Sequence, residues 1–352
     1  SVRCFTSSSR VTDVRRAPGG DGILVATRGG LLHYDPDGRL RRKTTRCDGL
    51  IGHTLEELAV TAGGEVWIAT AQGVSRLHAG GMSGYGTREG LNDDRAYAVA
   101  VDATERLFVG THRGVSRFDG ERFVPFNDTH EFSRRPTYDI HAARDGTLWF
   151  AKENALTQYL GDGRWRVFQR DPVTPGPRSD IVSNTVRQVV TDERGGPWIG
   201  TPRGLGYFDG SSWSHLFHNP RHGALAGLRD NRVAALALDP SGALWIGHGD
   251  ADGAGRALGV ARRDEGGWRY YTERDGLPAD RVYRVRAGTD GSIWIATRRG
   301  AARFENGSFE VFHTPGELPS NGVRTIVTLD DGRIAVVTRA GAAAVDRGAP
   351  SD

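Results

Sequence analysis

Short apolar segments recur along the chain, each followed by a tight polar turn and a second, shorter apolar segment. A clear copy is IWIAT (293–297), which follows an Asp-Gly turn and precedes an Arg-Gly turn and the segment AARF. Glycine allows the positive backbone angles of such turns, and apolar runs of this length are typical of buried strands. The pattern predicts many short antiparallel strands, and helical periodicity is absent throughout.

The apolar segment occurs eight times at a regular interval. The residues that end the eight copies are Thr27, Thr70, Thr111, Lys152, Thr201, His248, Thr297 and Thr338. Units of about 44 residues with four strands each are typical of β-propeller blades. We therefore predict an all-β fold, a single eight-bladed β-propeller of four-stranded antiparallel blades that occupies residues 1–352 as one domain.

The two ends of the chain complete each other in this prediction. The last copy has only three strand-like segments (323–329, 333–338 and 341–346), and the first seven residues, SVRCFTS, resemble the missing fourth. We expect residues 1–7 to pair with the last strand and close the ring, which removes a free sheet edge. Because the chain begins at Ser1 rather than at a methionine, we also expect a processed or cut product.

Large aromatic residues occupy the same position of the apolar segment in most copies. We expect them to pack between neighbouring blades as structural core. They are Trp67, Trp149, Trp198, Trp245 and Trp294.

The repeat pattern DGxLWIGTxxGVxRFDGxxFxxF, followed by a loop such as DGLPADRV, resembles the two-component regulator propeller repeat. The resemblance covers nearly the whole chain. It implies a periplasmic or extracellular sensor domain, of a kind found in histidine kinases and hybrid regulators, that often binds glycans or other small ligands. Eight copies differ from the seven-blade rings common in those sensors.

A more distant resemblance is to the streptogramin B lyases, also propellers, through the segment DGTLWFAKEN (145–154). The lyase site needs a histidine, a glutamate and a metal near the channel mouth. No such set aligns residue by residue with this sequence, so this resemblance implies fold more than chemistry.

Charge narrows the range of partners. Of 46 basic residues only Lys43 and Lys152 are lysines, and the arginines are spread among 43 acidic residues with a net charge of +3. A concentrated basic stripe, typical of nucleic-acid binders, is absent, so we predict no nucleic-acid partner. Coding bias is the simplest explanation of the arginine excess, and recognition of anions is the alternative. No apolar run is long enough for a transmembrane segment.

Cys4 and Cys47 are the only cysteines and have no CxxC spacing. We expect Cys4 within the fourth strand of the last blade and Cys47 just beyond the fourth strand of the first blade. The outer strands of neighbouring blades splay apart. A disulfide needs α-carbons within about 7 Å, so the sequence predicts two free thiols, and the cysteines leave the compartment open.

Candidate binding residues lie where the turns between second and third strands meet the starts of first strands, around the channel mouth. Arginine forks and tyrosine rings suit carboxylates, phosphates and sugars. We expect a small anionic or carbohydrate ligand, or a protein partner, there; solvated turn residues are the alternative interpretation. The candidates are Arg28, Arg113, Arg203, Arg299, Arg339, Tyr97, Tyr138, Tyr283, Arg187 and Arg324.

No motif identifies a catalyst, a cofactor or a metal site. GxSxG, HExxH and P-loop patterns are absent. The loop from Asp250 to Gly253 has Ala261 where a calcium loop needs glutamate, and His215, His218 and His222 do not share one face of a strand. A lyase or hydrolase that uses His248, His112 and Glu153 stays open as an alternative function, as does a pure protein-interaction scaffold.

Overall fold

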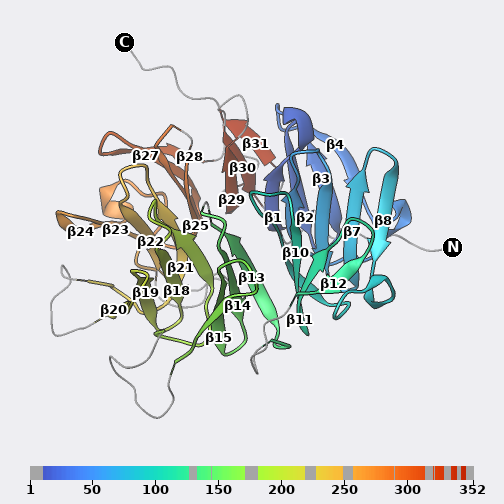
Figure 1. Ribbon diagram of the computed structural model, residues 1–352. Coiled ribbons are helices and arrows are strands. Elements are labelled where there is room, and N and C mark those ends of the chain that lie inside the picture. Colours follow the sequence, from blue (N-terminus) through green and yellow to red (C-terminus); the bar gives the residue numbers. More distant parts are fainter. Residues whose placement is uncertain are drawn as a thin grey trace. The chain divides into compact units, whose positions relative to one another are not determined.

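Eight antiparallel sheets make up the protein in the computed structural model (Figure 1). The chain divides into two compact units, Ser1–Phe168 and Gln169–Asp352, with four sheets in each. The described residues are 11–126, 133–143, 145–170, 181–218, 227–248, 257–288, 290–313, 320, 322–328, 334–338 and 342–345.

The first unit holds four sheets in which the strands follow chain order from the first strand to the outer fourth strand. The strands are β1 (Val11–Arg16), β2 (Ile23–Thr27), β3 (Gly30–Tyr34), β4 (Leu40–Thr44), β5 (Leu55–Val60), β6 (Val66–Thr70), β7 (Gly73–His78), β8 (Gly81–Tyr85), β9 (Ala96–Val101), β10 (Leu107–Thr111), β11 (Gly114–Phe118), β12 (Phe123–Pro125), β13 (Thr137–Ala142), β14 (Leu148–Lys152), β15 (Ala155–Tyr159) and β16 (Trp165–Phe168). The short 3-10 helices are η1 (Pro18–Gly20), η2 (Arg46–Asp48) and η3 (Thr87–Glu89).

The second unit repeats this arrangement, and its last sheet has three described strands. The elements are β17 (Gln188–Thr191), β18 (Pro197–Thr201), β19 (Gly204–Phe208), β20 (Trp213–Leu216), β21 (Val233–Leu238), β22 (Leu244–His248), β23 (Val260–Asp264), β24 (Gly267–Tyr271), η5 (Glu273–Asp275), β25 (Val282–Ala287), β26 (Ile293–Thr297), β27 (Gly300–Glu305), β28 (Ser308–Phe312), β29 (Val323–Thr328), β30 (Ile334–Thr338) and β31 (Ala342–Val345).

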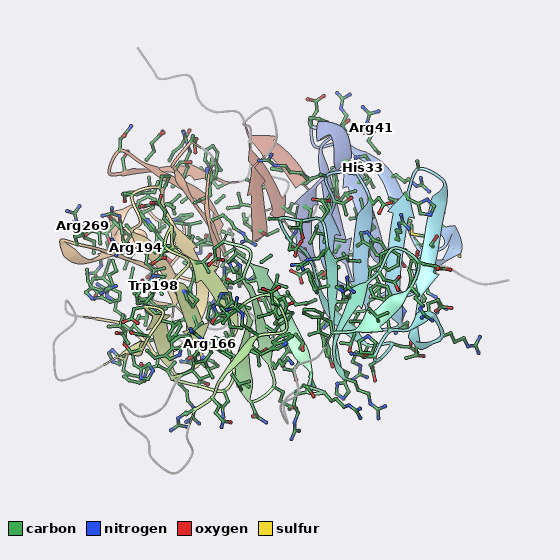
Figure 2. The ribbon with its side chains drawn as sticks, viewed as in Figure 1. His33, Arg41, Arg166, Arg194, Trp198 and Arg269 are labelled. Carbon is green, nitrogen blue, oxygen red and sulfur yellow. The ribbon has the colours of Figure 1, made fainter. Side chains whose placement is uncertain are left out.

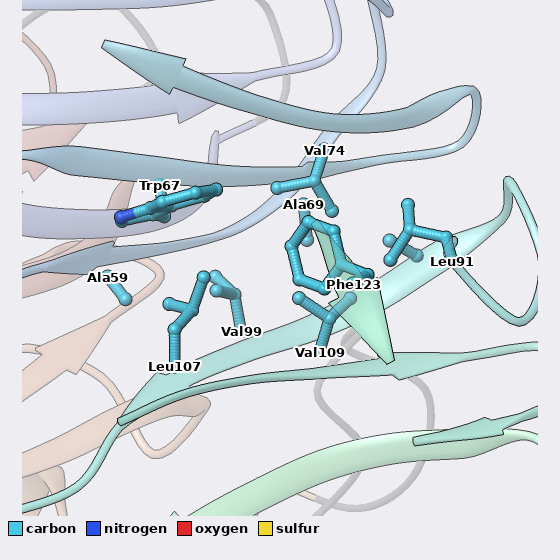
Figure 3. Close-up of a cluster of buried hydrophobic side chains, with 10 residues drawn as sticks. Ala59, Trp67, Ala69, Val74, Leu91, Val99, Leu107, Val109 and Phe123 are labelled. Carbon is cyan, nitrogen blue, oxygen red and sulfur yellow. The ribbon is translucent and has the colours of Figure 1, made fainter. Parts of the chain in front are cut away.

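The core of each unit lies between adjacent sheets. Second strands such as β6 and β26 are buried along their whole length, because a neighbouring sheet covers each face. Figure 3 shows Trp67 of one sheet packed with Val99, Leu107 and Phe123 of the next. The tryptophans predicted as core are buried, which confirms that prediction.

A threonine closes the turn after the second strand in five sheets. Its hydroxyl donates to the carbonyl of the glycine three residues later, as from Thr297 to Gly300 at 2.7 Å. The same oxygen accepts the backbone N–H two residues later, here from Arg299 at 3.3 Å. The other four threonines of this kind are Thr27, Thr70, Thr111 and Thr201. Lys152 and His248 take this position in two other sheets and are buried there.

The predicted fold class is confirmed: the protein is an all-β, eight-bladed propeller. Residues 1–7, which we expect to close the ring, lie outside the described residues, so ring closure stays a prediction. The prediction of one domain over 1–352 also stays a prediction beside the two compact units.

The prediction of two free thiols is wrong. Cys47 is disulfide-bonded, and Cys4 is the only other cysteine in the chain. Cys47 lies just beyond β4, in η2, as expected; the wrong step was that splayed outer strands would keep it out of reach of a second cysteine. At η2, Thr45 caps the turn and Gly49 adopts φ 105°, so the chain turns back toward β5.

Candidate functional site

A β-bulge at the start of the first strand places the predicted site residues. In seven of the eight described sheets the pairing of the first and second strands skips one residue there. Tyr97, Tyr138, Tyr283 and Arg324 are all skipped residues of this kind. Bulges re-aim a side chain and often lie beside functional sites. The regular bulge therefore explains why these positions recur.

Two of the bulge tyrosines come together in the first unit. The rings of Tyr97 and Tyr138 lie with centroids 5.2 Å apart. The Tyr97 hydroxyl shares a 3.0 Å hydrogen bond with Nδ1 of His112, in the turn after β10. Tyr138 remains 47% exposed. The arrangement presents the Tyr138 ring to solvent, in contact with the Tyr97 ring, which is tilted by 51° to it.

Charged groups flank this pair. Glu153, in the turn after β14, lies 3.9 Å from the guanidinium of Arg135 in the loop that leads into the same sheet. Partial burial raises the pKa of Tyr138, and the Glu153 carboxylate and Tyr97 add to that rise, so the phenol is neutral at neutral pH. We call Tyr97, His112, Arg135, Tyr138 and Glu153 the tyrosine patch.

Two of the turn arginines are paired with acids from the loop of their own sheet. Arg113 lies 4.0 Å from Asp93, and Arg299 lies 3.4 Å from Glu273. The Arg135–Glu153 pair of the tyrosine patch has the same construction with the two charges exchanged. Within each unit, these arginines therefore have carboxylate partners in the protein itself.

The remaining candidates are dispersed. Arg28 and Arg203 are exposed on their turns, and Arg187 is half-buried just before β17. Tyr283 is only 9% exposed, so its ring is not available as a platform like that of Tyr138. Arg339 and the side chain of Arg324 lie outside the described part of the structure.

Sequence reasoning missed a charged cluster on the first strands of the first unit. The Arg15 guanidinium lies 2.6 Å from the Asp13 carboxylate and 3.2 Å from that of Glu57. Burial raises the pKa of Glu57 to about 8; Arg15 opposes this rise, and the nearby Asp13 and Asp139 reinforce it. Charged residues inside strands that are otherwise apolar, as in LEELAV, are the signal that could have located it.

The open enzymatic alternative loses one of its three residues as an accessible base. His248 is only 2% exposed, and burial lowers its pKa to about 4, although the neighbouring Asp230 opposes this. The ring is thus neutral and enclosed at neutral pH. His112 and Glu153 both lie in the tyrosine patch. Within the described ranges, no group of three His, Cys, Asp or Glu side chains is arranged to hold a metal ion.

Comparison with known proteins places this fold among characterised propellers. No family model matches the sequence, and no curated protein matches it. Virginiamycin B lyase from Staphylococcus aureus superposes with a TM-score of 0.55 at 14% identity, over 81% of this chain and 92% of that one. PorZ, a surface component of the type-IX secretion system of Porphyromonas gingivalis, reaches 0.57 at 16% identity, over 92% and 50%.

The extracellular domain of BT4673 from B. thetaiotaomicron, described as a one-component system, matches with a TM-score of 0.50 at 15% identity, over 95% of this chain and 59% of that one. The resemblance of the repeat to sensor propellers and to streptogramin B lyases is thereby confirmed at the level of fold. The chain spans about half to three fifths of the length of the BT4673 domain structures it matches. Among the described residues, no helix is both long and apolar enough to cross a membrane.

Proposed function

We propose that this chain is a non-catalytic, ligand-binding propeller of the sensor type and that it binds a sugar-like ligand at the tyrosine patch. The observation that carries this proposal is the ring of Tyr138, which is 47% exposed and backed by Tyr97 at 5.2 Å. A supported, solvent-facing aromatic ring offers an apolar surface to the C–H face of a pyranose, beside polar groups that fix its orientation.

The polar groups around the ring favour a sugar over a simple anion. Glu153 supplies acceptors and Arg135 supplies donors for hydroxyl groups, and the two side chains form an ion pair with each other. Arg113 and Arg299 already have carboxylate partners, so phosphate or a small carboxylate would have to displace an acid to gain a guanidinium. A hydroxyl-rich ligand can bond to the paired groups without separating them.

Two observations support a periplasmic or extracellular location. Disulfides persist in oxidising compartments, and Cys47 is disulfide-bonded. The fold neighbours include an extracellular domain and a bacterial surface component. In the proposed role, ligand binding at the propeller is read by a further part of a signalling or surface protein.

The test compares the wild type with Tyr138→Ala and Tyr138→Phe against a panel of neutral oligosaccharides, with phosphate and acetate as comparators, by calorimetry. We expect the alanine variant to bind at least about tenfold more weakly, the loss of one stacking contact, and the phenylalanine variant to bind nearly as the wild type does. Urea unfolding should leave Tyr138→Phe within about 0.5 kcal/mol of the wild type and Tyr138→Ala within about 1.5 kcal/mol, the loss of its pair with Tyr97.

Sugar binding that survives in Tyr138→Ala would place the site elsewhere. Binding of anions alone, abolished in Arg203→Ala/Arg299→Ala, would favour the anionic ligand over the sugar. Recovery of shortened oligosaccharides after incubation would favour the lyase or hydrolase alternative, since a binding module returns its ligand intact.

A further inference from the structure

The outer strand of the first sheet, β4, differs in chemistry from the other outer strands. Five of the eight residues from 39 to 46 (RLRRKTTR) are cationic and none is acidic. Three other outer strands bury an aromatic side chain, namely Phe123 of β12, Phe168 of β16 and Phe312 of β28. In β4 the first three residues are exposed, and only Thr44 is buried.

The five cations from 39 to 46 outnumber the three nearest acids in the chain, Asp35, Asp37 and Asp48. The Asp35 carboxylate accepts a 3.0 Å bond from the Arg41 guanidinium and a 2.8 Å bond from the backbone N–H of Arg39. Asp48 caps the following turn through the backbone and hydroxyl of Thr45. Arg39, Arg42 and Arg46 stay exposed, and Figure 2 shows Arg41 on the solvent side of this sheet.

The cations lie on both faces of the strand. The pairing with β3 places Leu40 and Lys43 on one face and Arg42 on the other, and Arg41 is the extra residue of a bulge between Leu40 and Arg42. Leu40 is 52% exposed, a rare state for a large apolar residue in the described chain. A flat anionic membrane would meet only one face at a time. An extended chain along the strand edge meets both.

The edge of β4 is also free in the described structure, since β4 pairs with β3 alone. Unpaired strand edges are templates for a further strand. Cationic side chains repel a second copy of the same edge, so they disfavour self-association and select an oppositely charged partner.

We propose that β4 is a docking edge for an extended acidic segment of a partner protein, which adds to the first sheet as a fifth strand. In this complex, carboxylates on both faces of the incoming strand meet Arg41, Arg42 and Lys43, and an apolar side chain covers Leu40. The surface is independent of the tyrosine patch, which lies at the bulges of β9 and β13.

The experiment uses the full chain and three fluorescent probes: an octapeptide of alternating Glu and Val, the same peptide with central prolines, and its Lys-Val counterpart. Anisotropy titrations at 50 and 200 mM salt measure affinity. We expect the Glu-Val peptide to bind, the proline peptide to bind at least about tenfold more weakly because backbone pairing is blocked, and the Lys-Val peptide not to bind.

The variant Arg41→Glu/Arg42→Glu should lose at least about tenfold in affinity, whereas the matched variant Arg88→Glu/Arg122→Glu, exposed on other sheets of the same unit, should bind as the wild type does. Equal loss in both variants, or equal binding of the proline peptide, would overturn strand addition and leave a non-specific polyanion effect. Tighter binding to vesicles with 30% phosphatidylserine than to the peptide would assign the edge to a membrane surface instead. Retained sugar binding in Arg41→Glu/Arg42→Glu would separate this result from the proposed function.

Discussion

Single arginine side chains explain part of the arginine excess without any ligand. On several third strands a guanidinium lies over a tryptophan of a second strand, in the same sheet or the preceding one. Three of these groups, those of Arg76, Arg262 and Arg303, also meet a carboxylate from a turn. Planar guanidinium groups suit both contacts better than lysine does. The stacked pairs, with their distances to the ring centroid, are Arg76–Trp67 (5.2 Å), Arg263–Trp198 (5.1 Å), Arg262–Trp245 (5.9 Å) and Arg303–Trp294 (6.0 Å).

Arg303 provides the test at this scale. It is 11% exposed and lies 3.1 Å from Asp290 and 2.9 Å from Glu305. We expect Arg303→Ala to lower the free energy of unfolding by roughly 1–3 kcal/mol, because it removes the stacking and leaves a half-buried carboxylate without its cation. Arg303→Lys should recover only part of this.

Urea unfolding followed by tryptophan fluorescence measures the loss. The control is Arg299→Ala, whose exposed ion pair should be worth less than about 0.5 kcal/mol. Similar losses in Arg299→Ala and Arg303→Ala would show that stacking contributes nothing. Full recovery in Arg303→Lys would show that charge alone matters.

First strands are joined to their neighbours by side chains that follow the bulge. The Asp13 carboxylate accepts the Leu58 N–H at 3.0 Å, and that of Glu57 accepts the Val99 N–H at 3.1 Å. In the second unit the amide of Gln188, in β17, whose described pairing has no bulge, bonds to both backbone groups of Leu236. Each link satisfies a backbone donor that has no strand partner on that side. Each of these first strands is therefore hydrogen-bonded to the next sheet through one of its own side chains.

Glu57 should make the first unit sensitive to alkaline pH. Its pKa is raised by burial from 4.5 to about 8, so the folded state holds a proton that the unfolded state releases. The contribution of Glu57 to the free energy of unfolding is therefore greatest below about pH 4.5, and it is lost as the pH rises from there to about 8. We expect a loss of roughly 1–3 kcal/mol between pH 5 and 8 from Glu57.

Glu57→Gln removes the titrating proton and keeps the acceptor, as the natural Gln188 link does. Its urea midpoint should change less between pH 5 and 8 than that of the wild type, and it should be the more stable of the two at pH 8. Parallel pH profiles for the two proteins would show that Glu57 does not hold the proton.

Cys47 is disulfide-bonded, and the only other cysteine of the chain is Cys4. A bond from Cys4 to Cys47 closes a loop of about 43 residues, worth at most about 4 kcal/mol by loop-closure entropy. We expect Cys47→Ser to lower the melting temperature, and denaturing thiol titration of the wild type without reductant to find no thiols.

Deletion of residues 1–7 separates this bond from ring closure. If the segment also completes the last sheet, the deletion should destabilise more than Cys47→Ser and promote association through an exposed edge. Equal melting temperatures and equal sedimentation for the deletion and Cys47→Ser would leave the disulfide as the segment's whole contribution.

The sequence alone determined the repeat, its strands and its buried tryptophans, because these follow from local periodicity and turn chemistry: an apolar run ended by threonine and followed by glycine forms the same hairpin in each sheet. The exposure and the charge pairing of side chains at equivalent positions of the repeat depended on the residues packed around them. Tyr138 and Tyr283 are the skipped residues of equivalent bulges in two sheets. One ring is exposed and the other is buried, because the residues packed around each belong to different loops and sheets. Likewise, two of the turn arginines, Arg113 and Arg299, meet acids of their own loops, and Glu57 meets Arg15 from a strand 42 residues away. Burial and charge pairing arise between segments distant in the chain, so tertiary structure alone decided which of the repeated side chains is available to a ligand.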